Sequence, residues 1–208
     1  MEDIVIVGNG GFAHEIEGTI NRINFKQKIY SFLGYVDFDT TKERVIGNDD
    51  FLLGYEKPLN VIIAIADAKV RHKLSNLYKQ NKYLSFPNII DPSVIIMDNI
   101  SLGEGNIICA GSILTVNIRF GNFNIVNLGC TIGHGSVLEN YIILNPGVNI
   151  SGDVVLKENS FIGTGVQILQ GKTIGINAII GAGAVVTTDI THDCTAVGIP
   201  AKIIKDRG

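Results

Sequence analysis

The sequence predicts an α/β unit followed by a β-solenoid, and three observations support this prediction. The first ninety residues alternate between strand-like and helix-like patterns, beginning with the apolar run DIVIVG at 3–8. After Ile95 a six-residue repeat of large apolar residues replaces that alternation. The chain of 208 residues also holds 24 glycines without the every-third spacing of collagen, well above the usual share of roughly 7%. We therefore expect one domain over 1–90 and a second over 91–208.

The first domain is expected to be a short Rossmann-like unit. A continuous β-branched run at 3–8 is typical of a strand buried on both faces of a parallel sheet, and the glycine turn GNGG follows it. Residues 12–24 then carry apolar side chains near helical spacing. The remainder of this domain continues the alternation, with strands at 32–39 and 60–67 and a helix at 68–81. A segment with two prolines at 86–93 is expected to mark the boundary to the second domain.

The second domain is expected to be a parallel β-helix. Every sixth residue from Ile96 to Val186 is large and apolar, at all sixteen positions. Three residues after each of these, fourteen of the sixteen positions hold Gly, Asn or Asp, the residues that best tolerate a positive φ. This period fits neither a helix nor a hairpin array, but it suits hexapeptides that each supply a strand and a turn. The apolar residue then points inward and the turn residue forms a corner of the prism.

Composition limits the function classes. Hydrophobic residues make up 46% of the chain and the net charge is −3, which gives no basic surface for nucleic acid. Acidic residues near the N-terminus argue against a signal peptide, and no apolar run approaches the roughly 18 residues of a spanning helix. We expect a cytoplasmic protein without membrane insertion. Its three cysteines show no metal-ligand spacing and are expected to be free, buried thiols.

Five segments, in this order, give the chain a family resemblance. They are VGNGGFAHEI, TIGHG, PGVNISGDV, IGTGVQILQG and VGIPAKII. Together with the α/β unit and the hexapeptides, they resemble the bacterial sugar acyltransferases of the sialic acid O-acetyltransferase type, the NeuD/PglD-like family. The resemblance implies a left-handed β-helix of 18 residues per coil with a C-terminal tail. It also implies a homotrimer, active sites between neighbouring subunits, and acetyl-CoA as co-substrate.

His134, in the TIGHG segment, matches the family's general base. Acyl transfer from a thioester needs an amine or hydroxyl that loses its proton as it attacks, and imidazole, with a reference pKa of about 6.5, accepts that proton near neutral pH. From spacing alone, a turn-capping or surface histidine is the alternative. The family often has Asp or Glu directly after this histidine, whereas this chain has Gly135. Three alternatives follow: Asp153, one predicted coil above Gly135, holds the ring, a backbone carbonyl holds it, or the enzyme is slow.

The resemblance also assigns the acyl-donor site. Gly152 matches the position whose backbone N–H faces the thioester carbonyl, and a residue without Cβ suits such an oxyanion donor. Small residues let the pantetheine arm lie against the backbone, although the same glycines also serve the β-helix corners. For Lys202, near the C-terminus, a side chain of a solvated tail is the alternative. The coenzyme A contacts implied by the resemblance are Ile143, Gly152, Thr164, Ala182 and Lys202.

The sugar-nucleotide site is expected in the first domain. The segment 7–15 follows a strand and opens a helix, the setting of a phosphate-binding turn. Ala13 stands where the third glycine of a dinucleotide fingerprint belongs, so oxidoreduction is weakly supported. Asp67 and Arg71 are further lining candidates, with a solvated helix face as the alternative for Arg71. The substrate contacts implied by the resemblance are Gly10, Gly11, Phe12, Asp37 and Ala66.

These features predict an acetyl-CoA-dependent acetyltransferase of a nucleotide-linked amino sugar, acting by direct transfer in surface-glycan synthesis. O-acetylation of a sugar such as sialic acid is the alternative reaction. A trimeric scaffold or ligand sensor without catalysis is the alternative class, and Gly135 favours it. A hexapeptide-repeat metalloenzyme needs three ligand histidines, but the repeats hold only His134, so no metal is expected. No Ser or Cys–His pair indicates an acyl-enzyme.

Overall fold

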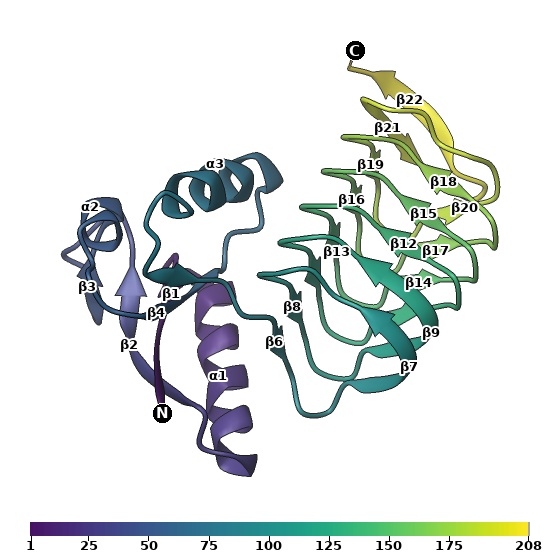
Figure 1. Cartoon of the computed structure of the whole chain (residues 1–208). Coiled ribbons are helices and arrows are strands. Elements are labelled where there is room, and N and C mark those ends of the chain that lie inside the picture. The colour runs from purple at the N-terminus through teal and green to yellow at the C-terminus, as the bar shows by residue number, and fades with distance from the viewer. Residues whose placement is uncertain (208) are drawn as a thin grey trace. The chain divides into compact units, whose positions relative to one another are not determined.

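The computed structural model describes residues 1–207 and forms two compact units, Met1–Pro92 and Ser93–Gly208 (Figure 1). The elements of the first unit are β1 (Glu2–Val7), α1 (Gly11–Lys26), β2 (Tyr30–Val36), β3 (Val45–Gly47), α2 (Asp49–Leu53), β4 (Leu59–Ile63), α3 (Ala68–Tyr78), β5 (Leu84–Ser85) and β6 (Ile89–Ile90). Five of its strands form a parallel sheet in the order β3-β2-β1-β4-β5.

The predicted Rossmann-like elements are present, with different ends and some additions. The strand expected at 60–67 ends at Ile63, because Asp67 caps α3 by accepting a hydrogen bond from the Val70 N–H at 3.0 Å. β3, α2 and β5 were not predicted, since segments of two to five residues are too short to show a period. No helix of residues 1–207 is long and apolar enough to cross a membrane.

The sheet topology brings three loops to one edge of the first unit. Because all its strands are parallel, the loops after β1, β2 and β4 leave from their common carboxyl edge. The chain changes direction between β1 and β4, and open α/β sheets bind ligands at such a switch point. Gly8 has φ +101°, and a Cβ there would lie 3.3 Å from the Ala64 carbonyl oxygen. The first and third of these loops therefore approach each other closely.

The second unit is a parallel β-helix. Its strands pair with partners one coil later, for example Ile125 with Ile143 and Thr131 with Asn149, which confirms the 18-residue coil. β9 is long and passes through a corner, because it pairs with β11 at one end and with β12 at the other. The strands are β7 (Ile95–Ser101), β8 (Ile107–Ile108), β9 (Ile113–Phe120), β10 (Ile125–Val126), β11 (Thr131–Ile132), β12 (Val137–Leu138), β13 (Ile143–Leu144), β14 (Asn149–Ile150), β15 (Val155–Leu156), β16 (Phe161–Ile162), β17 (Gln167–Ile168), β18 (Thr173–Ile174), β19 (Ile179–Ile180), β20 (Val185–Val186), β21 (Cys194–Val197) and β22 (Lys202–Asp206).

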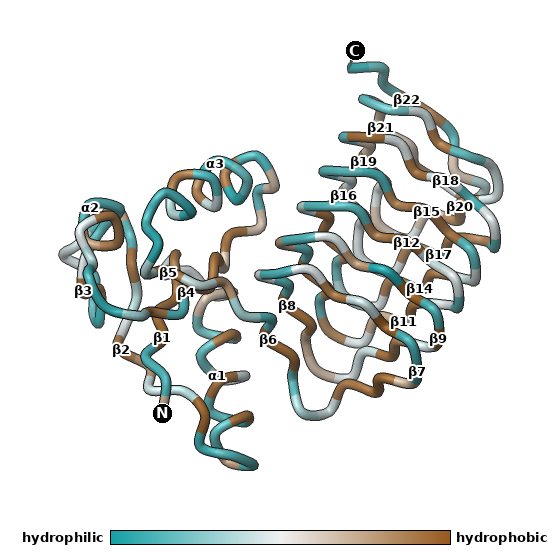
Figure 2. The backbone as a smooth tube through the Cα atoms, in the orientation of Figure 1, coloured by the Kyte–Doolittle hydropathy of each residue, from teal (hydrophilic) through white to brown (hydrophobic). Residues whose placement is uncertain are grey.

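The six-residue register predicts both the core and the corners. Figure 2 shows hydrophobic residues recurring along successive coils, and the inward positions from Ile108 to Val186 are all buried. Ile96, on the first strand of the prism, is 41% exposed. Every corner position from Asn99 to Gly183 has a positive φ, including the two aromatic exceptions Phe123 and Tyr141. The rings of these two stack in parallel, with centroids 5.6 Å apart.

Candidate active site

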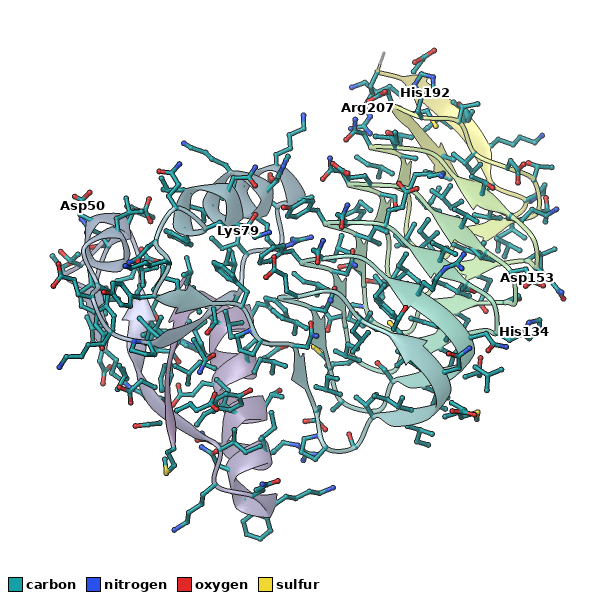
Figure 3. The ribbon with its side chains drawn as sticks, viewed as in Figure 1. Asp50, Lys79, His134, Asp153, His192 and Arg207 are labelled. Carbon is teal, nitrogen blue, oxygen red and sulfur yellow. The ribbon has the colours of Figure 1, made fainter. Side chains whose placement is uncertain are left out.

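His134 lies at an outward corner of the prism, between β11 and β12. Gly135, the corner residue, has φ +69°, and a Cβ on Gly133 would lie 2.5 Å from the Ser151 carbonyl carbon. Two glycines therefore allow a tight turn directly against the next coil. The imidazole between them projects away from the prism (Figure 3), and 56% of its side chain is exposed.

Gly152 occupies the position equivalent to His134 in the next coil, and the imidazole packs against it. A Cβ on Gly152 would lie 2.5 Å from His134 Nε2 and 2.9 Å from Nδ1. Only glycine therefore leaves room for the ring. No acceptor for the Gly152 N–H is found within residues 1–207, and Gly152 itself is buried beneath the ring.

Asp153 supplies a carboxylate beside the imidazole. Its Oδ2 lies 3.9 Å from His134 Nδ1, which is ion-pair range but too long for a hydrogen bond. Its backbone N–H donates to the His134 carbonyl oxygen at 2.7 Å, and Gln170 Nε2 donates to Oδ2 at 3.1 Å. A Cβ on Gly135 would collide with Asp153 Oδ1. The side chain of Asp153 thus fills the space over Gly135, and Figure 3 shows it next to His134.

The cysteines do not contribute a nucleophile to this corner. Cys109, Cys130 and Cys194 are free and buried, as predicted. Burial raises the pKa of the Cys130 thiol to about 11, although backbone hydrogen bonds lower it in part. A neutral thiol inside the prism is a poor nucleophile at neutral pH. His134 is therefore the candidate for acid–base chemistry at this corner.

The predicted coenzyme A residues do not all lie at this corner. Thr164 and Ala182 stack on a second corner, where the Gly183 N–H donates to the Thr164 carbonyl oxygen at 2.8 Å, and both are exposed. Lys202 is exposed on β22, whereas Ile143 is only 4% exposed on β13. The face that carries β14 and β17 separates this corner from that of His134. One chain alone thus brings together only the imidazole and Gly152.

The predicted phosphate-binding turn is open. Gly10 is the N-cap of α1 and carries no side-chain cap, so N–H groups at this helix end are available to an anion. A Cβ on Gly10 or Gly11 would meet nothing within 4 Å. Phe12, the next residue, is half-buried. This turn has the exposure and the donors that a diphosphate needs.

Asp37 and Ala66 lie at the same edge of the sheet as this turn. Asp37 follows β2, and its Oδ1 accepts hydrogen bonds from the Asp39 N–H at 3.0 Å and from Lys42 Nζ at 3.2 Å. Ala66 follows β4 and is exposed, and its carbonyl oxygen accepts a hydrogen bond from Arg71 at 2.9 Å. The topology therefore gathers all five predicted substrate residues at one edge.

Arg71 holds the loop after β4 in place. It is 1% exposed, which excludes the alternative of a solvated helix face. Its guanidinium donates to the carbonyl oxygens of Ile65 and Ala66 at 2.7 and 2.9 Å. The spacing of α3 alone gave no sign of this role, because the acceptors belong to a preceding loop.

A cavity of about 290 Å³ beside α1 was missed by the sequence analysis. Arg44 has φ +60° and donates two hydrogen bonds to Glu17, at 2.8 and 2.9 Å, and the Tyr35 hydroxyl donates to the same carboxylate. Burial raises the pKa of Glu17, but these bonds outweigh it and the net pKa is lowered. The cavity is lined by Asn9, His14, Glu17, Tyr35, Glu43 and Arg44.

Residues 1–207 contain no group of three or more His, Cys, Asp or Glu side chains arranged to hold a metal ion. His134 and His192 each have an Asp carboxylate within ion-pair range. The geometry therefore offers a proton acceptor at the His134 corner and anion-binding amides at the sheet edge.

Comparison with known proteins gives one family match and several similar structures. Residues 3–78 match the family model described as the PglD N-terminal domain. The fold is similar to perosamine N-acetyltransferase from Caulobacter crescentus, a mutant structure in complex with CoA and GDP-perosamine, with TM-score 0.91, 29% identity and coverage of 99% of this chain and 98% of that one. No curated protein sequence matches significantly.

Two further structures are similar over the full length. PerB from Caulobacter crescentus, in complex with CoA and GDP-perosamine, is 30% identical over 99% of this chain and 98% of that chain, with TM-score 0.89. WeeI from Acinetobacter baumannii AYE is 29% identical over 98% of this chain and 100% of that chain, with TM-score 0.87.

The fold and the similarity along the whole chain to a perosamine N-acetyltransferase structure define an acyltransferase built on hexapeptide repeats. Within that class, the chain belongs to the NeuD/PglD-like family of sugar acyltransferases. The predicted fold class is confirmed, including the left-handed β-helix behind a Rossmann-like unit.

Proposed function

We propose that the protein is an acetyl-CoA-dependent N-acetyltransferase of a nucleotide-linked amino sugar. The similarity along the whole chain to a perosamine N-acetyltransferase that binds CoA and GDP-perosamine supports this. The single observation that carries the proposal is the imidazole of His134 packed against Gly152, with Asp153 beside Nδ1. The cellular setting we propose is surface-glycan synthesis in the cytoplasm.

His134 acts as the general base in this proposal. The neutral amine of the sugar attacks the thioester carbonyl carbon, a C–N bond forms, and His134 accepts the proton that the nitrogen loses. The C–S bond then breaks, and the departing CoA thiolate takes up a proton to leave as the thiol. Gly152 donates its N–H to the oxyanion, a donor of a kind worth roughly 3–4 kcal/mol in known cases. Asp153 orients the ring through Nδ1.

A homotrimer accounts for the separation of the two corners. His134 and the pair Thr164 and Ala182 lie at different corners of one prism, so a cofactor that contacts both needs two chains side by side. We infer that coenzyme A lies between neighbouring subunits, against Gly152, Thr164, Ala182 and Lys202. Ile143 is the least supported of the predicted contacts, because it is almost fully buried.

The Rossmann-like domain, 1–90, holds the nucleotide sugar in this proposal. The diphosphate binds at Gly10, Gly11 and Phe12, where the N-terminal amides of α1 face open space. Asp37 and Ala66 lie at the same edge and are placed to contact the nucleoside and the sugar.

The test is turnover measured by CoA thiol release with UDP-linked and GDP-linked 4-amino sugars, with free sialic acid for comparison. We expect an amino sugar to be the substrate and His134→Ala to lower kcat at least about a hundredfold. Acetyl-CoA binding, measured by calorimetry, should remain close to wild type in this variant. Near-wild-type turnover by His134→Ala would eliminate the assignment.

O-acetylation is the second candidate reaction, because the same base can deprotonate a hydroxyl. Preferential turnover of sialic acid in this assay would establish it. The scaffold alternative rested on Gly135, because the residue directly after His134 then carries no carboxylate. Asp153 supplies a carboxylate at that place from the next coil, which removes its main support. Failure of the wild-type protein to bind acetyl-CoA would revive it.

A further inference from the structure

Phe38 carries a nearly fully exposed aromatic ring in the loop between β2 and β3. Its exposed fraction is 90%, whereas the apolar side chains of β2 at Tyr35 and Val36 are 1% exposed. Phe25 is exposed to the same degree, at 92%, but it lies near the C-terminal end of α1. Single exposed apolar residues are common, so exposure alone does not indicate a binding role for Phe38. Its position in the fold distinguishes it from Phe25.

The loop that carries Phe38 is tied down by its own hydrogen bonds. The Asp37 N–H donates to the Gly47 carbonyl oxygen at 3.1 Å, and Asp37 Oδ1 accepts from the Asp39 N–H at 3.0 Å. Asp39 Oδ1 in turn accepts from the Thr41 N–H at 3.1 Å and its hydroxyl at 2.6 Å. The ring is thus held out in water by an ordered loop whose polar groups are already paired.

Phe38 stands at the ligand-binding edge of the sheet. It follows β2 directly, and the open turn at Gly10 and Gly11 leaves the same edge from β1. In Rossmann-like folds an Asp or Glu at the end of the second strand hydrogen-bonds the ribose. Asp37 occupies the equivalent position here. A base attached to such a ribose has to lie against the residues that follow Asp37.

Lys42 adds a charge to this surface. Its Nζ lies 5.2 Å from the centroid of the Phe38 ring and 3.2 Å from Asp37 Oδ1. The ammonium therefore lies over the ring and also pairs with the carboxylate. A purine or pyrimidine fits this combination, because its flat face can stack on the ring while a carbonyl oxygen at its edge accepts from the ammonium.

We propose that Phe38 is the stacking platform for the base of the nucleotide sugar, with Lys42 at the edge of that base. The inference rests on the proposed function and adds a residue that determines affinity for the nucleotide. Because stacking does not require one base, Phe38 strengthens binding of any nucleoside diphosphate, and Lys42 favours bases with a carbonyl oxygen.

The test compares wild type, Phe38→Ala, Phe38→Trp and Phe25→Ala in calorimetric titrations with UDP and GDP. Phe38→Ala should weaken the better-bound of the two by about tenfold, the effect typical of a base stacked on an aromatic ring. Phe38→Trp should bind as wild type does, and so should Phe25→Ala, the matched loss of an equally exposed ring. In steady-state assays Phe38→Ala should raise KM for the amino sugar and leave KM for acetyl-CoA unchanged.

Two outcomes overturn the inference, and they are distinguishable. If wild type binds a nucleoside diphosphate and Phe38→Ala binds it within twofold, the platform is wrong while the proposed function stands. If wild type binds neither UDP nor GDP, the proposed function fails and the platform fails with it. A change in the oligomeric state of Phe38→Ala by light scattering, with unchanged nucleotide affinity, would assign the ring to a contact between copies instead.

Discussion

The imidazole of His134 packs against Gly152, the residue at the same position of the next coil. The proposed proton acceptor and the backbone amide above it are therefore held by two stacked turns of regular structure. Sites built on rigid elements keep their geometry better than sites on loops. The repeat that makes the core thus also sets the distance between the two groups.

Gly152→Ala tests this packing. Gly152 does not have a positive φ, so alanine fits the backbone, but its Cβ would occupy the space of the imidazole. We expect kcat to fall about a hundredfold or more, the loss typical of a displaced general base, with little change in the thermal unfolding midpoint. The measurement is steady-state turnover beside a melting curve.

The double variant Gly152→Ala with His134→Ala is the control. If alanine acts by displacing the ring, the double variant should be no slower than His134→Ala alone, because the ring is already gone. If the fold-decreases in kcat of the two single variants multiply in the double variant, the two residues act independently. Displacement of the ring by the alanine Cβ would then be wrong.

A second prediction concerns the carboxylate beside the imidazole. Asp153→Gly should lower kcat about tenfold to a hundredfold, the usual cost of losing the partner that orients a functional histidine. The double variant Gly135→Asp with Asp153→Gly returns a carboxylate to the same column, one coil lower. Asp tolerates a positive φ, and the collision with Asp153 is then absent. We expect the double variant to recover most of the lost turnover.

The neutral counterpart of this exchange, Gly135→Asn with Asp153→Gly, is the matched control and should stay slow. Equal turnover of the Asp and Asn double variants would show that charge at this column is irrelevant. A double variant with Asp that is as slow as Asp153→Gly alone would show that only position 153 can orient the ring.

The β-helix was the part of the fold best predicted from the sequence, because its period repeats sixteen times. Each hexapeptide has the same surroundings as the next, so one rule for inward residues and one for corners suffices. The register held even at Phe123, whose positive φ is unusual for a bulky side chain. The short elements β3 and α2 follow no period and depend on contacts such as the Asn48 cap.

The candidate site was less predictable, because it depends on contacts between coils and between loops. The sequence indicated the column of His134 and Gly152 through the 18-residue coil, yet it could not show that the ring fills the space over this glycine. The two alternatives for Arg71 could not be separated from the sequence for a similar reason. Its carbonyl partners belong to a preceding loop, and helical spacing carries no information about them.

The thiols provide a third prediction, directed at the reaction type. Cys130 is buried and its pKa is raised to about 11, so no acyl-enzyme should form on it. Cys130→Ala should retain turnover within about twofold. In native protein a disulfide reagent should label none of the three buried cysteines rapidly, whereas denatured protein should react with three equivalents. Loss of turnover in a folded Cys130→Ala variant would argue against direct transfer.

The last prediction concerns the pH dependence of stability in the Rossmann-like unit. The pKa of Glu17 lies below its ordinary value of 4.5, because hydrogen bonds from Arg44 and Tyr35 outweigh the effect of burial. Its ionised form therefore stabilises the folded state. This contribution is complete above pH 4.5 and is lost as the pH falls through the lowered pKa. Since the Arg44 side chain is half exposed, the contribution should be on the order of 1 kcal/mol.

Urea unfolding at neutral pH and at about pH 3.5 measures this term. Glu17→Gln should be less stable than wild type at neutral pH, and the difference should shrink as the pH falls, because protonation of Glu17 removes the charge that Gln lacks. Glu15→Gln, which removes an exposed carboxylate from the same helix, should differ little from wild type at either pH. A constant gap between Glu17→Gln and wild type at both pH values would mean that packing, rather than the charge of Glu17, stabilises this corner of the fold.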